Sequence, residues 1–349
     1  MDLAQLLQLT IEKKASDLHI VPHYYPAIRV NGELTQLKTY QIIEPATAAA
    51  VLTSILTSEQ KENFFVNREL DFGYNYNGMR FRVNMYFTKG GVAASFRLIS
   101  NIIRSPEELG LPTILTSFTK LRQGFVLLTG PTGEGKSTTL ASIINEINLN
   151  SDRHILTIED PIEYMYPAAK AIVSQREIGQ DTHNWSIALK SALREDPDVV
   201  LIGEMRDYET IQAALTIAET GHLVFSTVHT NSASQTIDRI IDVFPNHQQA
   251  QIRIQLASVL AGIVTQRLVP SNTEGRVPAC EVLLNNSATA ATIREGKTHM
   301  IDNIIQTSSA EGMIYFENNL ANLYTSGKIS KETALGYAIR PTEIQKLIS

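Results

Sequence analysis

The sequence predicts an α/β protein in which a small N-terminal α+β domain precedes a larger domain built on a parallel-rich sheet. Three observations predict this arrangement. Short alternating runs separated by turn signals fill the first hundred residues, and apolar runs alternate with helical ones from about residue 117. A glycine-rich loop follows the first of these later apolar runs and opens a helix. Buried strands that alternate with helices are typical of a parallel sheet covered on both faces.

Composition excludes several classes of protein. Of the 349 residues, 43% are hydrophobic and 19% are charged, which is typical of a folded chain and not of a disordered one. The net charge of −6 gives the whole chain no attraction for nucleic acid, and only a local basic groove stays open. The single cysteine, Cys280, excludes a disulfide framework and a zinc site made of thiolates, and it favours a reducing compartment.

The N-terminus shows no targeting signal. It lacks a basic segment followed by an apolar one, and no run of the sequence approaches the roughly 20 apolar residues that span a bilayer. We therefore expect a cytoplasmic protein that does not insert directly into a membrane and that has no nucleic-acid partner.

Residues 1–100 are expected to form the small domain. Apolar residues at near-helical spacing predict a helix within 1–15, and a second helix is expected near 46–56. The runs LHIV, AIRV, DFGYNY, RFRVNMYF and VAASFRLI are typical of antiparallel strands. Asn31-Gly32 and Asn77-Gly78 indicate hairpin turns, because both central residues of such a turn need a positive φ.

Residues 101–116 are expected to link the domains, and 117–349 to form the larger one. The segment from Ser100 to Thr116 holds two prolines and a glycine where the hairpin pattern stops, with a hinge expected at Ser105–Pro112. Beyond it, strands are expected at FVLLT, HILTI, DVVLIG and HLVFSTV, and helices from Ser137, around 186–195 and over 209–220. After Thr236 the pattern predicts mostly helix.

The loop after FVLLT matches G-x-x-x-x-G-K-[ST] in the strand–loop–helix context that this pattern requires. Glycines let the backbone turn its N–H groups toward anionic oxygens, and the following helix adds its positive N-terminal end. Lys136 supplies a point charge for the β- and γ-phosphates and Ser137 a hydroxyl for Mg²⁺. The expected ATP-binding residues are Gly130, Pro131, Thr132, Gly133, Glu134, Gly135, Lys136, Ser137 and Thr138.

Carboxylates follow two of the expected strands. HILTI runs into Glu159, Asp160 and Glu163, and DVVLI runs into Glu204. Because parallel strands end at one edge of a sheet, Glu204 can polarise a water or hold hydrated Mg²⁺ beside the loop, and Glu163 lies on a neighbouring loop. The alternatives are a solvated carboxylate at Glu204 and a plain turn begun by Asp160-Pro161.

Histidines bracket the strand HLVFSTV. His229, at its carboxyl end, can serve as a hydrogen-bonding sensor of the γ-phosphate or have only a structural role. His222, at the opposite end, is expected to be structural or to lie at an interface. The two histidines do not form a zinc site, because no further ligand has the spacing to complete it.

No arginine stands at a motif-defined position beside the γ-phosphate. The small domain carries Arg80, Arg82 and Arg97 on hairpin strands, with Arg80 and Arg82 on one face of the same strand. An arginine supplied by a neighbouring subunit can raise a hydrolysis rate by roughly 10³ to 10⁵, so a second subunit is expected to complete the site. The alternative is a pair of arginines on a solvated strand face.

Four segments together resemble the signature boxes of the secretion and type IV pilus ATPases: GPTGEGKST, TIEDPIEY, SALREDPDVVLIGEMRD and TGHLVFSTVHTNSASQTIDRIIDVFP. SDLHI, GMRFRVN, ACEVLL and IREGKTHMIDNIIQT extend the resemblance over nearly the whole chain, and within the superfamily it is strongest to the pilus retraction ATPases. The resemblance implies a PAS-like N-terminal domain joined to a RecA-like P-loop ATPase domain. It also implies a homohexamer at the inner face of the cytoplasmic membrane, docked on a PilC-like platform protein and possibly joined by a paralogous pilus ATPase.

The resemblance also implies residue roles. Lys136 and Ser137 would hold ATP and Mg²⁺, and Glu204 would be the catalytic glutamate, with a water between it and the metal. Glu163 and His229 would be the acid and the sensor of two further boxes. Arg82, with Arg80 or Arg97, would act in the site of the next subunit.

One segment departs from the retraction pattern. The subfamily's AIRNLIRE box aligns with residues 288–295, which keep IRE and lose the first arginine and the asparagine. A PilU-like accessory ATPase and a ring adaptor that binds ATP without hydrolysing it are therefore alternatives to a retraction motor. One cysteine and 349 residues argue against assembly ATPases of the PilB and GspE type, which add a domain and a zinc segment.

Overall fold

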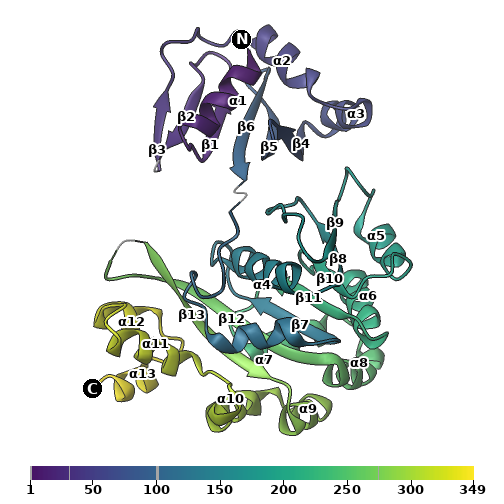
Figure 1. Cartoon of the computed structure of the whole chain (residues 1–349), viewed down its shortest axis with the longest axis vertical. Coiled ribbons are helices and arrows are strands. Elements are labelled where there is room, and N and C mark those ends of the chain that lie inside the picture. The colour runs from purple at the N-terminus through teal and green to yellow at the C-terminus, as the bar shows by residue number, and fades with distance from the viewer. Residues whose placement is uncertain (1, 31, 100–101, 274) are drawn as a thin grey trace. The chain divides into compact units, whose positions relative to one another are not determined.

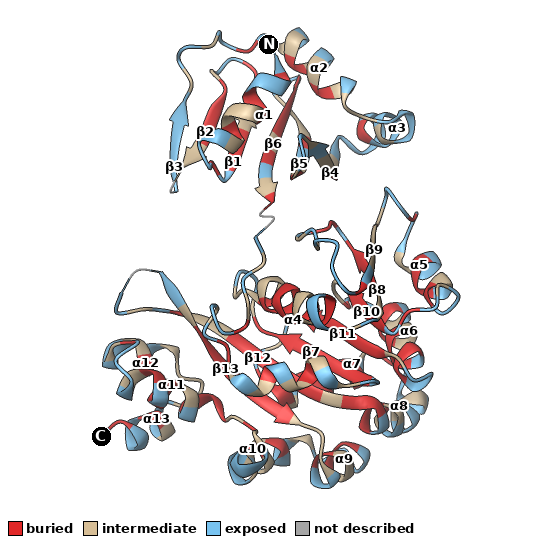
Figure 2. Ribbon diagram, in the orientation of Figure 1, coloured by how far each residue is buried: buried red, intermediate tan, exposed pale blue. Residues whose placement is uncertain are grey.

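The computed structural model describes residues 2–30, 32–99, 102–273 and 275–349, which form two compact units (Figures 1 and 2). Unit 1 comprises Met1–Ile102 and Pro161–Met165, and unit 2 comprises Ile103–Asp160 and Tyr166–Ser349. Among the described residues, no helix has both the length and the apolar character needed to cross a bilayer.

The described residues of unit 1 form a six-stranded antiparallel sheet in the order β3-β2-β1-β6-β5-β4. Its strands are β1 (Asp17–Ile20), β2 (Ala27–Val30), β3 (Glu33–Gln36), β4 (Glu69–Tyr76), β5 (Met79–Thr88) and β6 (Gly91–Ile99). The helices are α1 (Leu3–Glu12), α2 (Pro45–Ser54) and α3 (Ser58–Asn67). Apolar side chains from α1, α2, α3 and one face of the sheet share one core, in which Leu6, Leu52, Phe64 and Phe96 are buried.

The predicted helices and strands of unit 1 are confirmed, with two omissions. β3 is exposed along its whole length and therefore shows no apolar alternation. α3 buries only Phe64, although a capping box between Thr57 and Gln60 fixes its start. The turn at Asn77-Gly78 has the expected positive φ values of 48° and 73°, whereas Asn31 lies outside the described residues. The likeness of this unit to a PAS domain stays a prediction.

The described residues of unit 2 form a seven-stranded sheet in the order β13-β12-β7-β11-β10-β8-β9, in which β13 alone is antiparallel to its neighbour. The strands are β7 (Gly124–Thr129), β8 (His154–Glu159), β9 (Ile172–Glu177), β10 (Val199–Ile202), β11 (Leu223–Val228), β12 (Leu260–Pro270) and β13 (Arg276–Leu284). This is the parallel-rich sheet that the sequence predicts.

Helices cover both faces of this sheet (Figure 1). Phe125 and Leu127 pack into the core under one set of helices, while Val126 and Leu128 pack into the opposite core. The first core holds α5 (Trp185–Ala192), α6 (Tyr208–Glu219), α7 (Ala233–Asp242), α8 (Asn246–Val259), α9 (Ser287–Arg294) and α10 (Ile301–Thr307). The second holds η1 (Thr113–Lys120) and α4 (Lys136–Asn150), and a third core joins β12 and β13 to α11 (Phe316–Thr325), α12 (Lys331–Tyr337) and α13 (Pro341–Leu347).

The expectation of mostly helix beyond Thr236 is confirmed by α8 to α13, but it misses two strands, because β12 and β13 lie there and pair over nine residue pairs. β12 begins at Leu260, directly after α8 ends at Val259, so no turn signal separates the two elements. The expected linker also has more structure than its composition suggests. Its last residues belong to η1, where Leu115 and Phe118 are buried in unit 2. The hinge stays a prediction.

Candidate nucleotide-binding and active site

Residues 130–135 form a loop between β7 and α4 with the backbone shape that phosphate binding requires. Gly130, Gly133 and Gly135 have φ values of 140°, 83° and 77°, which side chains rarely allow. A Cβ on Gly130 would lie 2.3 Å from the carbonyl oxygen of Gln266. Among the described residues, no side chain caps the N-terminus of α4. Glycine conformation and an uncapped 15-residue helix together fit an anionic phosphate group.

The ammonium of Lys136 lies at the mouth of this loop. It donates hydrogen bonds to the carbonyl oxygens of Gly130 at 2.7 Å and Pro131 at 2.8 Å. Ser137 and Thr138 follow in the first turn of α4 and are half-buried. The lysine side chain is buried although it carries a charge, which is typical of a residue placed for an anionic ligand.

Three neighbouring strands bring Lys136, His229 and Glu204 together. β7, β11 and β10 are adjacent and parallel, so their carboxyl ends share one edge of the sheet. His229 Nδ1 lies 3.4 Å from Lys136 Nζ, and His229 Nε2 lies 3.7 Å from Glu204 Oε2. The hydroxyl of Thr227 donates to the carbonyl oxygen of Gly203 at 2.7 Å and so fixes the two strand ends to each other. The imidazole therefore stands between the ammonium and the carboxylate.

Burial lowers the pKa of His229, and the nearby ammonium of Lys136 lowers it further. The carboxylate of Glu204 opposes this shift. Because the ordinary pKa of histidine is about 6.5, the imidazole is neutral at pH 7 and can accept a hydrogen bond from Lys136.

Arg206 is a site residue that the sequence reasoning missed. Its guanidinium forms an ion pair with Glu204 at 2.6 Å, and its side chain is 76% exposed. The signal was present, since Arg206 stands two residues after Glu204 in the run GEMRD, but no pattern assigned it a role. An arginine therefore does stand beside the acid, although none was expected from the motifs of this domain.

The other predicted acids have different surroundings. Glu159 is buried and accepts hydrogen bonds from the hydroxyl of Thr157 at 2.7 Å and the amide of Gln175 at 3.3 Å. Asp160 follows it at the end of β8, and Glu163 belongs to the segment Pro161–Met165 of unit 1. The predicted role of Glu163 stays a prediction.

Glu134 faces strand β12. Its carboxylate accepts a hydrogen bond from the backbone N–H of Leu268, and its carbonyl oxygen accepts one from the Gln266 side chain at 2.7 Å. Arg276 of β13 also reaches the loop, because its guanidinium lies 3.4 Å from the carbonyl oxygen of Gly133. No sequence pattern predicts these contacts, since β12 and β13, which make them, lie in the region expected to be mostly helical.

The three arginines of unit 1 lie on neighbouring strands. Arg82 of β5 stands directly opposite Arg97 of β6. Arg82 pairs with Asp71 at 2.7 Å, and Arg97 pairs with Asp17 at 2.9 Å. Arg80 is buried, and its guanidinium donates to the side chain of Asn75 at 3.2 Å. The sheet therefore gathers the predicted arginines on one face, the one opposite its apolar core.

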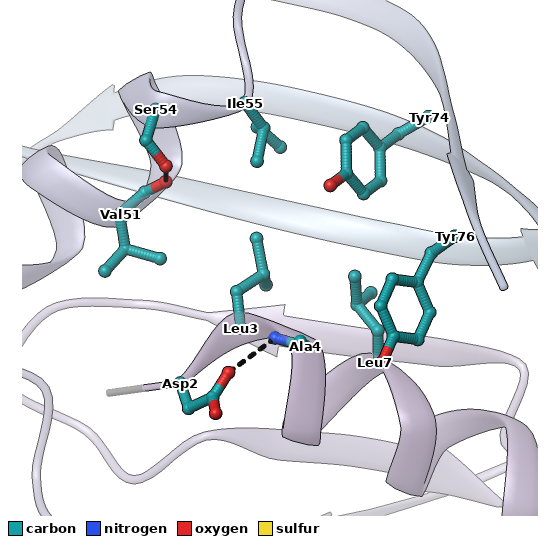
Figure 3. Close-up of a pocket in the computed structure, with 9 residues that line it drawn as sticks. All are labelled: Asp2, Leu3, Ala4, Leu7, Val51, Ser54, Ile55, Tyr74 and Tyr76. Atoms are coloured by element: carbon teal, nitrogen blue, oxygen red, sulfur yellow. Dashed lines mark hydrogen bonds between the residues drawn. The ribbon is translucent and has the colours of Figure 1, made fainter.

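Unit 1 also holds a cavity of about 420 Å³ (Figure 3). Its floor and walls come from α1, α2 and β4, and include Leu3, Leu7, Val51, Ile55, Tyr74 and Tyr76. None of the predicted site residues lines it.

Comparisons with known proteins agree with this geometry. The family model for type II/IV secretion system proteins matches residues 1–340. The chain is 42% identical over 335 residues to the type IV pilus retraction ATPase PilT of Pseudomonas aeruginosa, covering 96% of this chain and 97% of that one. It is 39% identical over 350 residues to the type IV pilus ATPase PilU of the same organism, covering 100% of this chain and 91% of that one.

A solved structure of the pilus retraction motor PilT with bound ADP superposes with a TM-score of 0.91. The two chains are 41% identical, and the match covers 99% of each. The fold described above is therefore similar to that of a nucleotide-binding motor over its whole length.

Proposed function

Since this chain belongs to the type II/IV secretion system protein family, we propose that it is an ATPase motor that powers retraction of type IV pili. The placement of His229 between Lys136 and Glu204 at the mouth of a phosphate loop carries this proposal. The similarity of this chain to a pilus retraction ATPase over 96% of its length supports the motor function. Its similarity to a twitching motility protein of Neisseria gonorrhoeae, 44% identical over 88% of this chain, supports a role in twitching motility.

In this proposal the chain's own residues divide the work of hydrolysis. The loop amides and Lys136 hold the β- and γ-phosphates, for which the ammonium gives up its bonds to Gly130 and Pro131. Glu204 orients the attacking water and takes its proton, while neutral His229 hydrogen-bonds the γ-phosphate. The Ser137 hydroxyl and a water on Glu204 would hold Mg²⁺, which would supply positive charge to neutralise the phosphates.

We further propose an assembled motor. Six identical chains would form a ring in which Arg80, Arg82 or Arg97 of one subunit completes the site of the next, with residues 105–112 as the hinge of each chain. The ring would work in the cytoplasm, docked on an inner-membrane platform protein of the PilC type. The exposed ion pair of Arg82 with Asp71 suits this role, because exposed pairs contribute little stability and exchange partners readily.

An accessory pilus ATPase is the second candidate, and a particular observation favours it. Residues 288–295, which depart from the retraction pattern, form most of α9, and the chain is also similar to a PilU over its full length. A strain that lacks this chain and keeps another retraction ATPase separates the two functions. Loss of all retraction supports the motor, and retraction weakened only under load supports the accessory role.

Hydrolysis of Mg-ATP by the purified chain and two variants tests the active site. Lys136→Ala should lose both nucleotide binding and turnover. Glu204→Gln should keep binding and lose turnover by at least about a hundredfold, since it removes the group that takes the proton. Glu209→Gln, an exposed carboxylate nearby on α6, serves as the matched control and should hydrolyse ATP normally. Full turnover in both variants would overturn the assignment, and normal function of Glu204→Gln in cells would support a non-hydrolysing adaptor.

A further inference from the structure

We propose that Gln266 of β12 is a positioning residue that holds the phosphate loop in its nucleotide-ready shape before nucleotide arrives. The inference rests on the proposed ATP site, and it concerns a residue outside every motif that predicts that site. Gln266 is 1% exposed, so both ends of its amide must find partners inside the protein.

Both ends of the amide do find partners, and both partners flank the phosphate site. The Gln266 Nε2 donates to the carbonyl oxygen of Glu134, in the loop, at 2.7 Å. Its Oε1 accepts a hydrogen bond from the hydroxyl of Thr139, in the first turns of α4, at 2.8 Å. Thr139 is also 1% exposed. One side chain therefore joins the end of the loop to the helix that the loop opens.

The backbone of the same residue supports the start of the loop. A Cβ on Gly130 would lie 2.3 Å from the Gln266 carbonyl oxygen, and a Cβ on Gly135 would lie 3.1 Å from its Nε2. The next contact along β12 is the Leu268 N–H that binds the Glu134 carboxylate. β12 thus contacts the loop at both ends, and Gln266 makes most of those contacts.

The chemistry of this site explains why an amide suits it. Three glycines give the loop more freedom than any other residues would, so ordering it costs conformational entropy. A lysine or arginine at this position would compete with Lys136 for phosphate, and an apolar side chain would leave the partly buried Glu134 carbonyl without its donor. A neutral amide orders the loop in advance, so less of the nucleotide's binding free energy is spent on ordering it.

The consequence is a specific effect on affinity. If the loop is held less well, a smaller fraction of the chains has the nucleotide-ready loop. The apparent affinity for nucleotide falls in proportion to that fraction. Once nucleotide is bound, its phosphates hold the loop themselves, so the turnover of the saturated enzyme depends little on Gln266.

The experiment measures the Kd of ADP by calorimetry and the kcat and KM for Mg-ATP. Gln266→Met keeps the volume and removes both hydrogen bonds. We expect its Kd and KM to rise about tenfold, which corresponds to about 1.4 kcal/mol, while kcat stays within about twofold. Thr139→Val removes one of the two bonds and should raise Kd about threefold, and the double variant should be no weaker than Gln266→Met because the two changes remove the same contact.

Asn285→Leu is the matched control. Its amide also joins two backbone carbonyls, those of Ala257 at 3.0 Å and Leu260 at 2.8 Å, at the start of the same strand. This variant should lower the unfolding temperature and leave the Kd of ADP unchanged. An unchanged Kd in folded Gln266→Met, or in Thr139→Val where Gln266→Met fails to fold, would overturn the inference. A wild-type chain that binds no ADP would instead overturn the proposed function.

Discussion

At the scale of single residues, the position of His229 makes hydrolysis depend on pH. Its pKa lies below the ordinary histidine value because the imidazole is partly buried beside the ammonium of Lys136. Protonation would remove the acceptor that faces Lys136 and place two cations 3.4 Å apart.

We therefore expect kcat/KM for Mg-ATP to be constant near neutral pH. It should fall about tenfold per pH unit below the lowered pKa of His229, as one protonation requires. His229→Asn should reduce the rate and abolish this fall. His222→Asn, at the opposite end of β11, should leave the fall in place. If kcat/KM of His229→Asn falls at low pH in the same way as that of wild type, a group other than His229 titrates.

A second residue makes stability depend on pH. Glu281 is fully buried on β13, where one carboxylate oxygen accepts the backbone N–H of Ala233 at 2.8 Å. Burial raises its pKa to about 7, and the acids Asp302 and Glu317 add to the rise while Arg340 opposes it. Because the folded chain holds this proton more tightly than the unfolded chain, the stabilisation is complete below pH 4.5 and is lost as pH rises toward 7.

The size of this effect is on the order of 3 kcal/mol, since each unit of pKa shift corresponds to about 1.4 kcal/mol. Denaturant unfolding at pH 5 and pH 8 should show wild type losing stability by this order as pH rises. Glu281→Gln should lose little over the same interval. Glu311→Gln, an exposed acid, is the control and should behave as wild type does. Equal pH dependence in Glu281→Gln would contradict the assignment.

At the scale of elements, the sequence predicts best the helices and strands whose pattern lies within one short stretch of chain. β7, β8, β10 and β11 are short apolar runs bounded by turns or helices, and all four are confirmed. β12 is missed because its partner β7 is distant in the sequence and because β12 continues directly from α8. β13 pairs with β12 across a short connection and is missed with it. The same limit applies to the site. Lys136, Glu204 and His229 stand in local patterns, whereas Gln266 contacts the loop only because β12 pairs with β7.

β12 also gives a prediction about packing. A Cβ on Gly262 would lie 2.8 Å from the Phe118 ring of η1 and 2.9 Å from the Leu283 carbonyl of β13. Gly262→Ala should therefore cost about 1–3 kcal/mol of unfolding free energy, as overpacking of a core does. Gly336→Ala is the control, because it meets nothing within 4 Å inside α12. It should stabilise by about 0.5–1 kcal/mol, since alanine suits a helix better than glycine does. Thermal unfolding of both variants tests the pair, and an equal loss in both would contradict this view of the packing.

At the scale of the whole molecule, the chain carries the proposed phosphate site in unit 2 and a set of three arginines in unit 1. Arg82 and Arg97 face each other across β5 and β6, and Arg82 pairs with an exposed aspartate, Asp71, that can release it to a stronger anion. If an arginine acts in the site of the next subunit, hydrolysis requires assembly. Specific activity should then rise cooperatively with chain concentration, and sizing of the same samples should show rings appearing over the same range.

Mixing two inactive variants tests this arrangement most directly. Glu204→Gln loses the catalytic acid and keeps its arginines, whereas Arg82→Ala keeps the acid and loses an arginine. In a ring mixed at equal amounts, an Arg82→Ala subunit beside a Glu204→Gln subunit has an intact acid and a neighbour's arginine. Random mixing makes about one site in four of this kind, so activity should return to about a quarter of the wild-type value if the arginine acts from the neighbour. Lys136→Ala mixed with Glu204→Gln should stay inactive, because both changes damage the same unit of the chain.

The same experiment with Arg80→Ala and Arg97→Ala identifies the arginine, because the variant that is inactive alone and restored by mixing is the one that has lost it. If no arginine variant recovers when mixed, each chain completes its own site, and Arg206 beside Glu204 becomes the arginine to test.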